Sequence, residues 1–95
     1  MEYHPALLRS IKDFNSSRYF EAHEHLEEAL DEVEEEENTW QLFVGLIRVA
    51  VGYHKYASGF PGGEGMLKIG LQTLAALPDV CAGVLLEALR QRVRP

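Results

Sequence analysis

Apolar residues recur along the chain at steps of three and four, which is the spacing of one face of a helix. A first helix is predicted to start at Pro5, since proline is favoured at the first helical position. Its apolar face consists of Leu7, Leu8, Ile11 and Phe14. Residues 15–17 (Asn-Ser-Ser) favour caps and turns and should end this helix.

A second helix is predicted from about residue 17 to about residue 33. Its expected inward seam is Tyr19, His23, Leu26, Leu30 and Val33. Six of the seven residues from 31 to 37 are acidic. Because negative charge at a helix C-terminus opposes the helix dipole, we expect this end of the helix to fray.

A third helix is predicted from Trp40 to Ser58, capped by Asn38 or Thr39 and closed by Gly59. Apolar residues surround most of it, so it should be the central helix of the fold. Gly45 and Gly52, seven residues apart, should let a neighbouring backbone approach closely.

The glycine-rich stretch 59–65 is interpreted as a chain reversal, because it lacks the Gly-Lys-Ser/Thr ending of a phosphate-binding loop. A fourth helix should follow through Leu77 and end at Pro78, and a last helix is expected at about 84–93. The chain therefore predicts a single all-α domain over residues 1–95, a compact bundle of about four or five short helices.

Charge and cysteine content narrow the classes of function. Nine Lys and Arg against fifteen Asp and Glu give a net charge of −6, which is the wrong sign for a nucleic-acid-binding protein. The single cysteine, Cys81, fits a reducing compartment, and no apolar run approaches the ~20 residues that cross a bilayer. We expect a cytoplasmic protein without a nucleic-acid or membrane partner; a protein partner or a homo-oligomer remains open.

Candidate chemistry lies on the second and third helices. A projection at about 100° per residue places His23 and Glu27, one turn apart, among apolar neighbours, with Glu24 at the border of that face. A buried carboxylate alone costs several kcal/mol, so Glu27 should have a partner. The candidate polar network consists of His23, Glu27, Gln41, Arg48 and His54.

Three functions are compatible with this pattern. The favoured one is a non-catalytic structural or interaction module in which the polar network is buried and satisfied. The second is a hydrolase dependent on a divalent metal, with His23, Glu27 and His54 as ligands and Glu24 as general base, by analogy with the zinc-protease pattern His-Glu-x-x-His. The third is a small-ligand site that requires a dimer to complete its pocket; no cofactor is predicted outright.

Residues 14–27, which include the run Tyr-Phe-Glu-Ala-His-Glu at 19–24, resemble a small helical family of bacteria and archaea known as domain of unknown function 309. Residues 45–50, together with His54, Gly59 and Gly65, are similar to its second conserved block. The resemblance implies an all-helical fold and no established biochemistry. This chain departs from the family pattern at Leu30, where Trp is usual, and at Arg48, where Gln is usual. An Arg at position 48 could pair with Glu27, which favours the network over the metal site.

Overall fold

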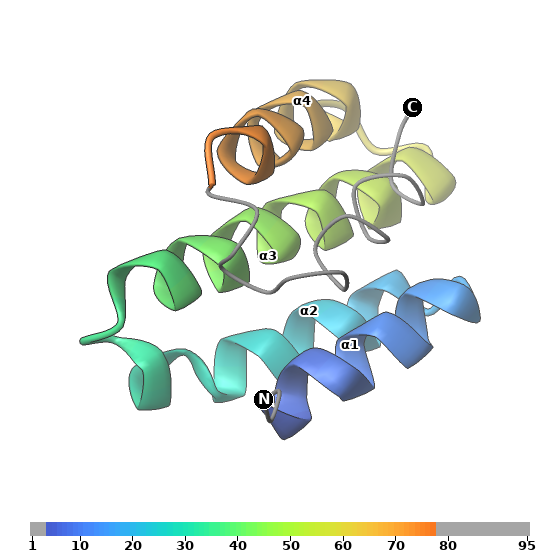
Figure 1. Cartoon of the computed structure of the whole chain (residues 1–95). Coiled ribbons are helices and arrows are strands. Elements are labelled where there is room, and N and C mark those ends of the chain that lie inside the picture. Colours follow the sequence, from blue (N-terminus) through green and yellow to red (C-terminus); the bar gives the residue numbers. More distant parts are fainter. Residues whose placement is uncertain (1–3, 78–95) are drawn as a thin grey trace.

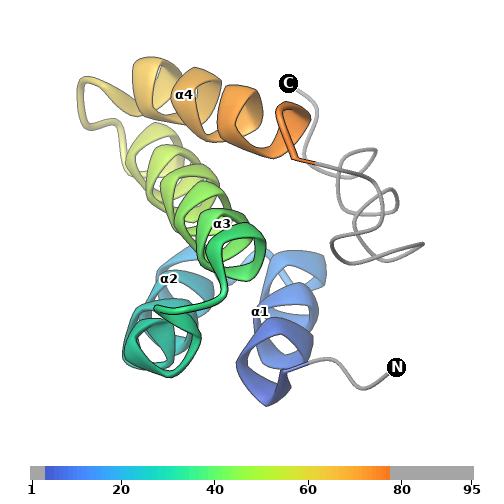
Figure 2. The same cartoon turned by 60° about the vertical axis from the view of Figure 1, so that its left-hand side comes forward.

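A computed structural model describes residues 4–77. Its elements are α1 (Pro5–Asn15), α2 (Tyr19–Glu28), a short 3-10 turn η1 (Leu30–Val33), α3 (Glu37–Ala57) and α4 (Gly63–Ala75). Helix α3 lies between α4 on one side and the α1–α2 pair on the other (Figures 1 and 2). The predicted all-α bundle with a central third helix is confirmed. The helix predicted at 84–93 and Cys81 lie outside the described residues.

Helix α1 is amphipathic, but its buried face differs from the predicted one. Leu7 and Phe14 are buried as expected, whereas Leu8 is 51% exposed. Ser10 and Asp13 are buried instead. The buried face is therefore rotated away from Leu8, and it carries a carboxylate that the apolar pattern did not reveal.

Helix α1 ends at residues 15–17, as predicted, and the structure shows that the chain leaves it through a left-handed residue. Ser17 has φ 59°, the N–H of Arg18 donates to the carbonyl of Asp13 at 2.7 Å, and the N–H of Ser17 donates to that of Phe14 at 3.1 Å. These two bonds form a Schellman motif, which satisfies carbonyls that the last helical turn leaves unpaired. The turn sends the chain back, so that α2 packs beside α1.

Helix α2 is shorter than predicted, because it ends at Glu28 and the chain continues as η1. The acidic run thus falls largely outside α2, in keeping with the expected fraying. Glu36 and Glu37 instead start α3, where negative charge is favourable to the helix dipole. The prediction that Asn38 or Thr39 caps this helix is wrong: both lie within α3, and no side chain caps it.

Helices α3 and α4 pack closely because glycines line their contact. A Cβ on Gly52 would lie 2.7 Å from the backbone nitrogen of Leu67, and one on Gly70 would lie 2.8 Å from that of Val49. A Cβ on Gly45 would lie 2.9 Å from Leu74 Cδ2. The close approach of a neighbouring backbone is confirmed at Gly52, whereas the atoms nearest to Gly45 belong to side chains, and in both cases α4 is the helix that approaches.

The turn between α3 and α4 is the predicted chain reversal. Gly59 has φ 75° and Gly62 has φ 88°, a conformation that glycine adopts without steric cost. The N–H of Phe60 donates to the carbonyl of Lys55 at 2.9 Å, closing α3 with a second Schellman motif. Gly59 therefore ends α3 as predicted.

The core is built around α3. Its largest fully buried side chains include Leu42, Phe43, Leu46 and Val49 of α3, with Leu26 of α2 and Leu74 of α4. Within residues 4–77, no helix is long and apolar enough to cross a membrane.

Candidate functional site

The outward face of α2 carries the histidine–carboxylate pair that the sequence singled out. His23 Nε2 contacts Glu27 Oε2 one turn farther along the helix, so the expected partnership is present. The side chain of His23 is 24% exposed and that of Glu27 is 59% exposed. The expectation that Glu27 is buried is therefore wrong, and this pair lies at the surface.

Glu27 is exposed because a different face of α2 packs against the other helices. The buried residues of this segment are Ala22, Leu26 and Ala29. In helical projection they lie on average about 130° from Glu27, so Glu27 faces away from the core. Small alanines allow close helix packing, and here they mark the contact with the rest of the fold. The large side chains of Tyr19 and Leu30, on which the predicted seam relied, lie at its edge and are only partly buried.

Phe20 brings the outward face of α2 together with α3. Its side chain is 45% exposed. Its ring lies 5.8 Å from that of His23 and 5.3 Å from that of His54, measured between centroids. His54 of α3 therefore borders the same surface as His23, with both imidazoles packed on one phenyl ring. Within residues 4–77, however, no three His, Cys, Asp or Glu side chains are arranged to hold a metal ion.

This surface is hollowed. An open depression of about 410 Å³ is lined, among residues 4–77, by five residues of α2: Phe20, His23, Glu24, Glu27 and Glu28. We refer to it as the α2 depression. Its three glutamates are all exposed, so an aromatic ring and an imidazole lie within a rim of negative charge. Such a surface suits a cationic group, which can pair with carboxylates and stack on an aromatic face.

Arg48 lies away from the α2 depression. Its Nη1 donates a hydrogen bond of 2.9 Å to Thr73 Oγ1 of α4, and the Thr73 hydroxyl donates in turn to the carbonyl of Ile69 at 3.0 Å. Gln41 is partly buried near the start of α3. The candidate network is thus divided, with Arg48 serving the α3–α4 contact. Because Arg48 bonds to Thr73 on α4, it gives no reason to disfavour a metal at His23 and Glu27.

Sequence reasoning missed a second histidine–carboxylate pair, which is more buried. Nδ1 of His25 donates to Asp13 Oδ2 at 2.7 Å, and Arg18 Nε lies 3.8 Å from Asp13 Oδ1. The Asp13 side chain is only 6% exposed, and that of His25 is 34% exposed. The pair joins α1 to α2. Its signal in the sequence is the position of Asp13, which is three residues after Ser10 and next to Phe14 on the buried face of α1.

The α2 depression lies within the part of the chain that matches a known family. The family model described as "Domain of unknown function (DUF309)" matches residues 7–66, from α1 to the first turn of α4. No curated protein and no solved structure gives a significant match. The matched part covers well over half of the chain, and it contains Phe20, His23, Glu24, Glu27 and His54. The chain belongs to the DUF309 family.

Proposed function

We propose that this chain is a non-catalytic interaction module and that the α2 depression receives a basic segment of a protein partner. The observation that carries the proposal is Phe20, a large apolar side chain that is 45% exposed inside a rim of glutamates. An exposed aromatic ring is a typical anchor of protein–protein interfaces. The single cysteine of the chain also leads us to propose a cytoplasmic location.

Charge complementarity supports the choice of a basic partner. Glu24, Glu27 and Glu28 surround the ring, and the chain as a whole carries a net charge of −6. An arginine of the partner could stack on Phe20 while its guanidinium pairs with a carboxylate of the rim. The negative charge of this surface would also speed its encounter with a basic segment.

The test is fluorescence anisotropy with a labelled arginine-rich peptide that carries a central leucine. Phe20→Ala should weaken binding at least about tenfold, the loss expected for an aromatic anchor. Leu8→Ala is the matched control, since Leu8 is 51% exposed on α1 and is not part of the α2 depression. Equal affinities of the wild type and Phe20→Ala would refute the proposal.

A second pair of variants separates a specific rim from general acidity. Glu24→Gln with Glu28→Gln should weaken binding clearly more than Glu35→Gln with Glu36→Gln, because all four residues are exposed but only the first two line the α2 depression. Both double variants change the net charge equally. Equal losses would show that the peptide responds to net charge alone.

A divalent-metal hydrolase is the second candidate, because His23, Glu24 and Glu27 line one depression and His54 is near it. This candidate requires stoichiometric Zn²⁺ binding that His23→Ala and His54→Ala each weaken. Isothermal titration with ZnCl₂ decides between the two functions. The interaction module predicts that the wild type and the two variants behave alike.

A further inference from the structure

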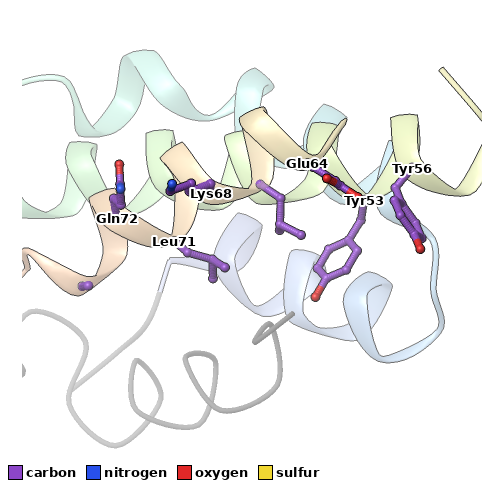
Figure 3. Close-up of a pocket in the computed structure, with 8 residues that line it drawn as sticks. Tyr53, Tyr56, Glu64, Lys68, Leu71 and Gln72 are labelled. Carbon is purple, nitrogen blue, oxygen red and sulfur yellow. The ribbon is translucent and has the colours of Figure 1, made fainter. Parts of the chain in front are cut away.

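A second hollow lies between α3 and α4, with Tyr53 at one end, where its ring stacks on that of Tyr19 of α2. It has a volume of about 930 Å³ and is lined mainly by apolar side chains. Figure 3 shows Tyr53 and Tyr56 at one end, Leu71 farther along, and Glu64, Lys68 and Gln72 along the edge. We call it the α3–α4 groove. Leu67, Leu71 and Ala75, at steps of four, form its apolar wall on α4.

The chain that leaves α4 starts beside this groove. Helix α4 ends at Ala75, Leu77 is buried, and residues 78–95 continue from there. The sequence places apolar residues at helical spacing in 84–93: Val84, Leu85, Leu86, Leu89 and Val93. An amphipathic helix in a globular protein must bury its apolar face against another element.

Length favours an intramolecular fit. A helix of the ten residues 84–93 is about 15 Å long, and the wall of α4 from Glu64 to Ala75 rises by about 17 Å. Residues 78–83 form a connection of six residues, within the ~2–8 that commonly join packed helices. The connection can reach about 20 Å when extended, enough for the chain to turn back along α4.

The charges of the two surfaces do not oppose this packing, because, among residues 4–77, the charged residues that line the groove are one acid, Glu64, and one base, Lys68. Residues 84–95 contain Arg90, Arg92 and Arg94 and the single acid Glu87, whereas the chain as a whole is acidic. We propose that residues 84–93 form a helix that packs by its apolar face into the α3–α4 groove of the same chain. A second copy would compete poorly, because a short connection holds the segment at an effective concentration in the millimolar range.

The proposal is independent of the α2 depression, and it is tested on the full chain without any variant. Nuclear Overhauser contacts between the methyl groups of Leu67 or Leu71 and those of Leu85 or Leu89 are expected. A sample that mixes differently labelled copies shows whether the contacts form within one chain. Contacts only between copies would assign the groove to a dimer and overturn the proposal, as would the absence of such contacts.

Matched variants then locate the interface by hydrogen exchange. Leu71→Asp should speed the exchange of the 84–93 amides at least about tenfold, whereas Ile69→Asp, about 200° away on α4 and 47% exposed in the wild type, should not. From the other side, Leu89→Asp should have the same effect and Gln91→Asp should not. Equal exchange rates of the 84–93 amides in Leu71→Asp and Ile69→Asp would contradict the proposed interface. If Leu71→Asp unfolds the chain, the nuclear Overhauser contacts of the wild type decide whether the interface exists.

Discussion

Asp13 and Glu27 are both carboxylates that contact a histidine, yet their surroundings give them different weight. Asp13 is 6% exposed and joins α1 to α2 through His25, whereas Glu27 is 59% exposed and contacts a residue of its own helix. Removing Asp13 leaves the part-buried His25 without its acceptor, whereas removing Glu27 exposes His23 to water. Burial, not the presence of a partner, decides which pair matters for stability.

We therefore predict that Asp13→Ala lowers the free energy of unfolding by about 1.5–3 kcal/mol, the range for a hydrogen bond to a charged group. Glu27→Ala should cost less than about 1 kcal/mol, because even a fully charged pair at an exposed site contributes no more than that. Urea denaturation followed by circular dichroism measures both. A larger loss for Glu27→Ala than for Asp13→Ala would show that the two pairs have been ranked wrongly.

Tyr53 makes stability depend on alkaline pH. Partial burial, with a smaller contribution from the neighbouring Tyr19, raises the pKa of Tyr53 above its ordinary value of 10.0. The two rings stack with centroids 4.9 Å apart. Because the folded state holds this proton more tightly than the unfolded state, the stabilisation is complete below pH 10.0 and is lost as the pH rises through the raised pKa.

The prediction is that the free energy of unfolding falls with pH above about 10 and that Tyr53→Phe reduces this slope. Tyr56→Phe, which changes a tyrosine that is 67% exposed, should leave the slope unchanged. Denaturation at a series of alkaline pH values gives the slopes. An identical slope in Tyr53→Phe and in the wild type would remove Tyr53 as its source.

At the residue scale, the sequence indicated that His23 contacts Glu27, because i and i+4 positions face each other on any helix. It misjudged which way the pair points, because the seam was drawn through large apolar side chains. The buried alanines Ala22 and Ala29 mark the true contact, and small residues add little to an apolar pattern. Asp13 escaped notice because its partner is twelve residues away, across a turn whose geometry no local pattern contains.

At the scale of elements, the close contact between α3 and α4 depends on glycines, which have no side chain. Gly70 of α4 faces the backbone of Val49, and an added Cβ would lie 2.8 Å from its nitrogen. Gly65, in the same helix, has open space within 4 Å of an added Cβ. The two glycines therefore form a matched pair within one helix, in which only one is needed for packing.

Gly70→Ala should destabilise the fold by about 1–3 kcal/mol, the usual cost of overpacking. Gly65→Ala should be neutral or stabilise by up to about 1 kcal/mol, because alanine is the better helix former. Thermal unfolding of the two variants gives the comparison. Similar melting temperatures would mean that α4 does not approach α3 as closely as the structure has it.

The helices themselves were largely predictable, because both the helical spacing of apolar residues and the turn-forming residues at 15–17 and 59–65 are local features of the sequence. Gly45 and Gly52 also predicted that another element packs closely against this helix, although the sequence does not say which one, because that depends on the tertiary structure. The boundary near residue 37 was misplaced by a few residues. Acidic side chains disfavour a helix C-terminus and favour an N-terminus, so one run of charge both shortened α2 and lengthened α3.

At the scale of the whole molecule, α3 is the element that joins the two sides of the bundle. Helices α1 and α2 pack against each other, and α4 packs on the opposite side of α3 (Figure 2). Phe43 of α3 is fully buried, and its ring meets that of His4, at the start of α1, edge-on with centroids 5.6 Å apart. The apolar character of α3 predicted this central place, because a helix with apolar residues on most sides must be covered on several sides.

Phe43→Ala should therefore weaken both sides of the bundle at once. A cavity at a buried phenylalanine costs about 3–5 kcal/mol, a large share of the ~5–15 kcal/mol that stabilises a small domain. Native-state hydrogen exchange should show the slowest amides of α1 and those of α4 losing the same free energy of protection, while Ile69→Ala, at an exposed position of α4, leaves both nearly unchanged. If α4 kept its protection while α1 and α2 lost theirs, the two sides would unfold separately and α3 would not couple them.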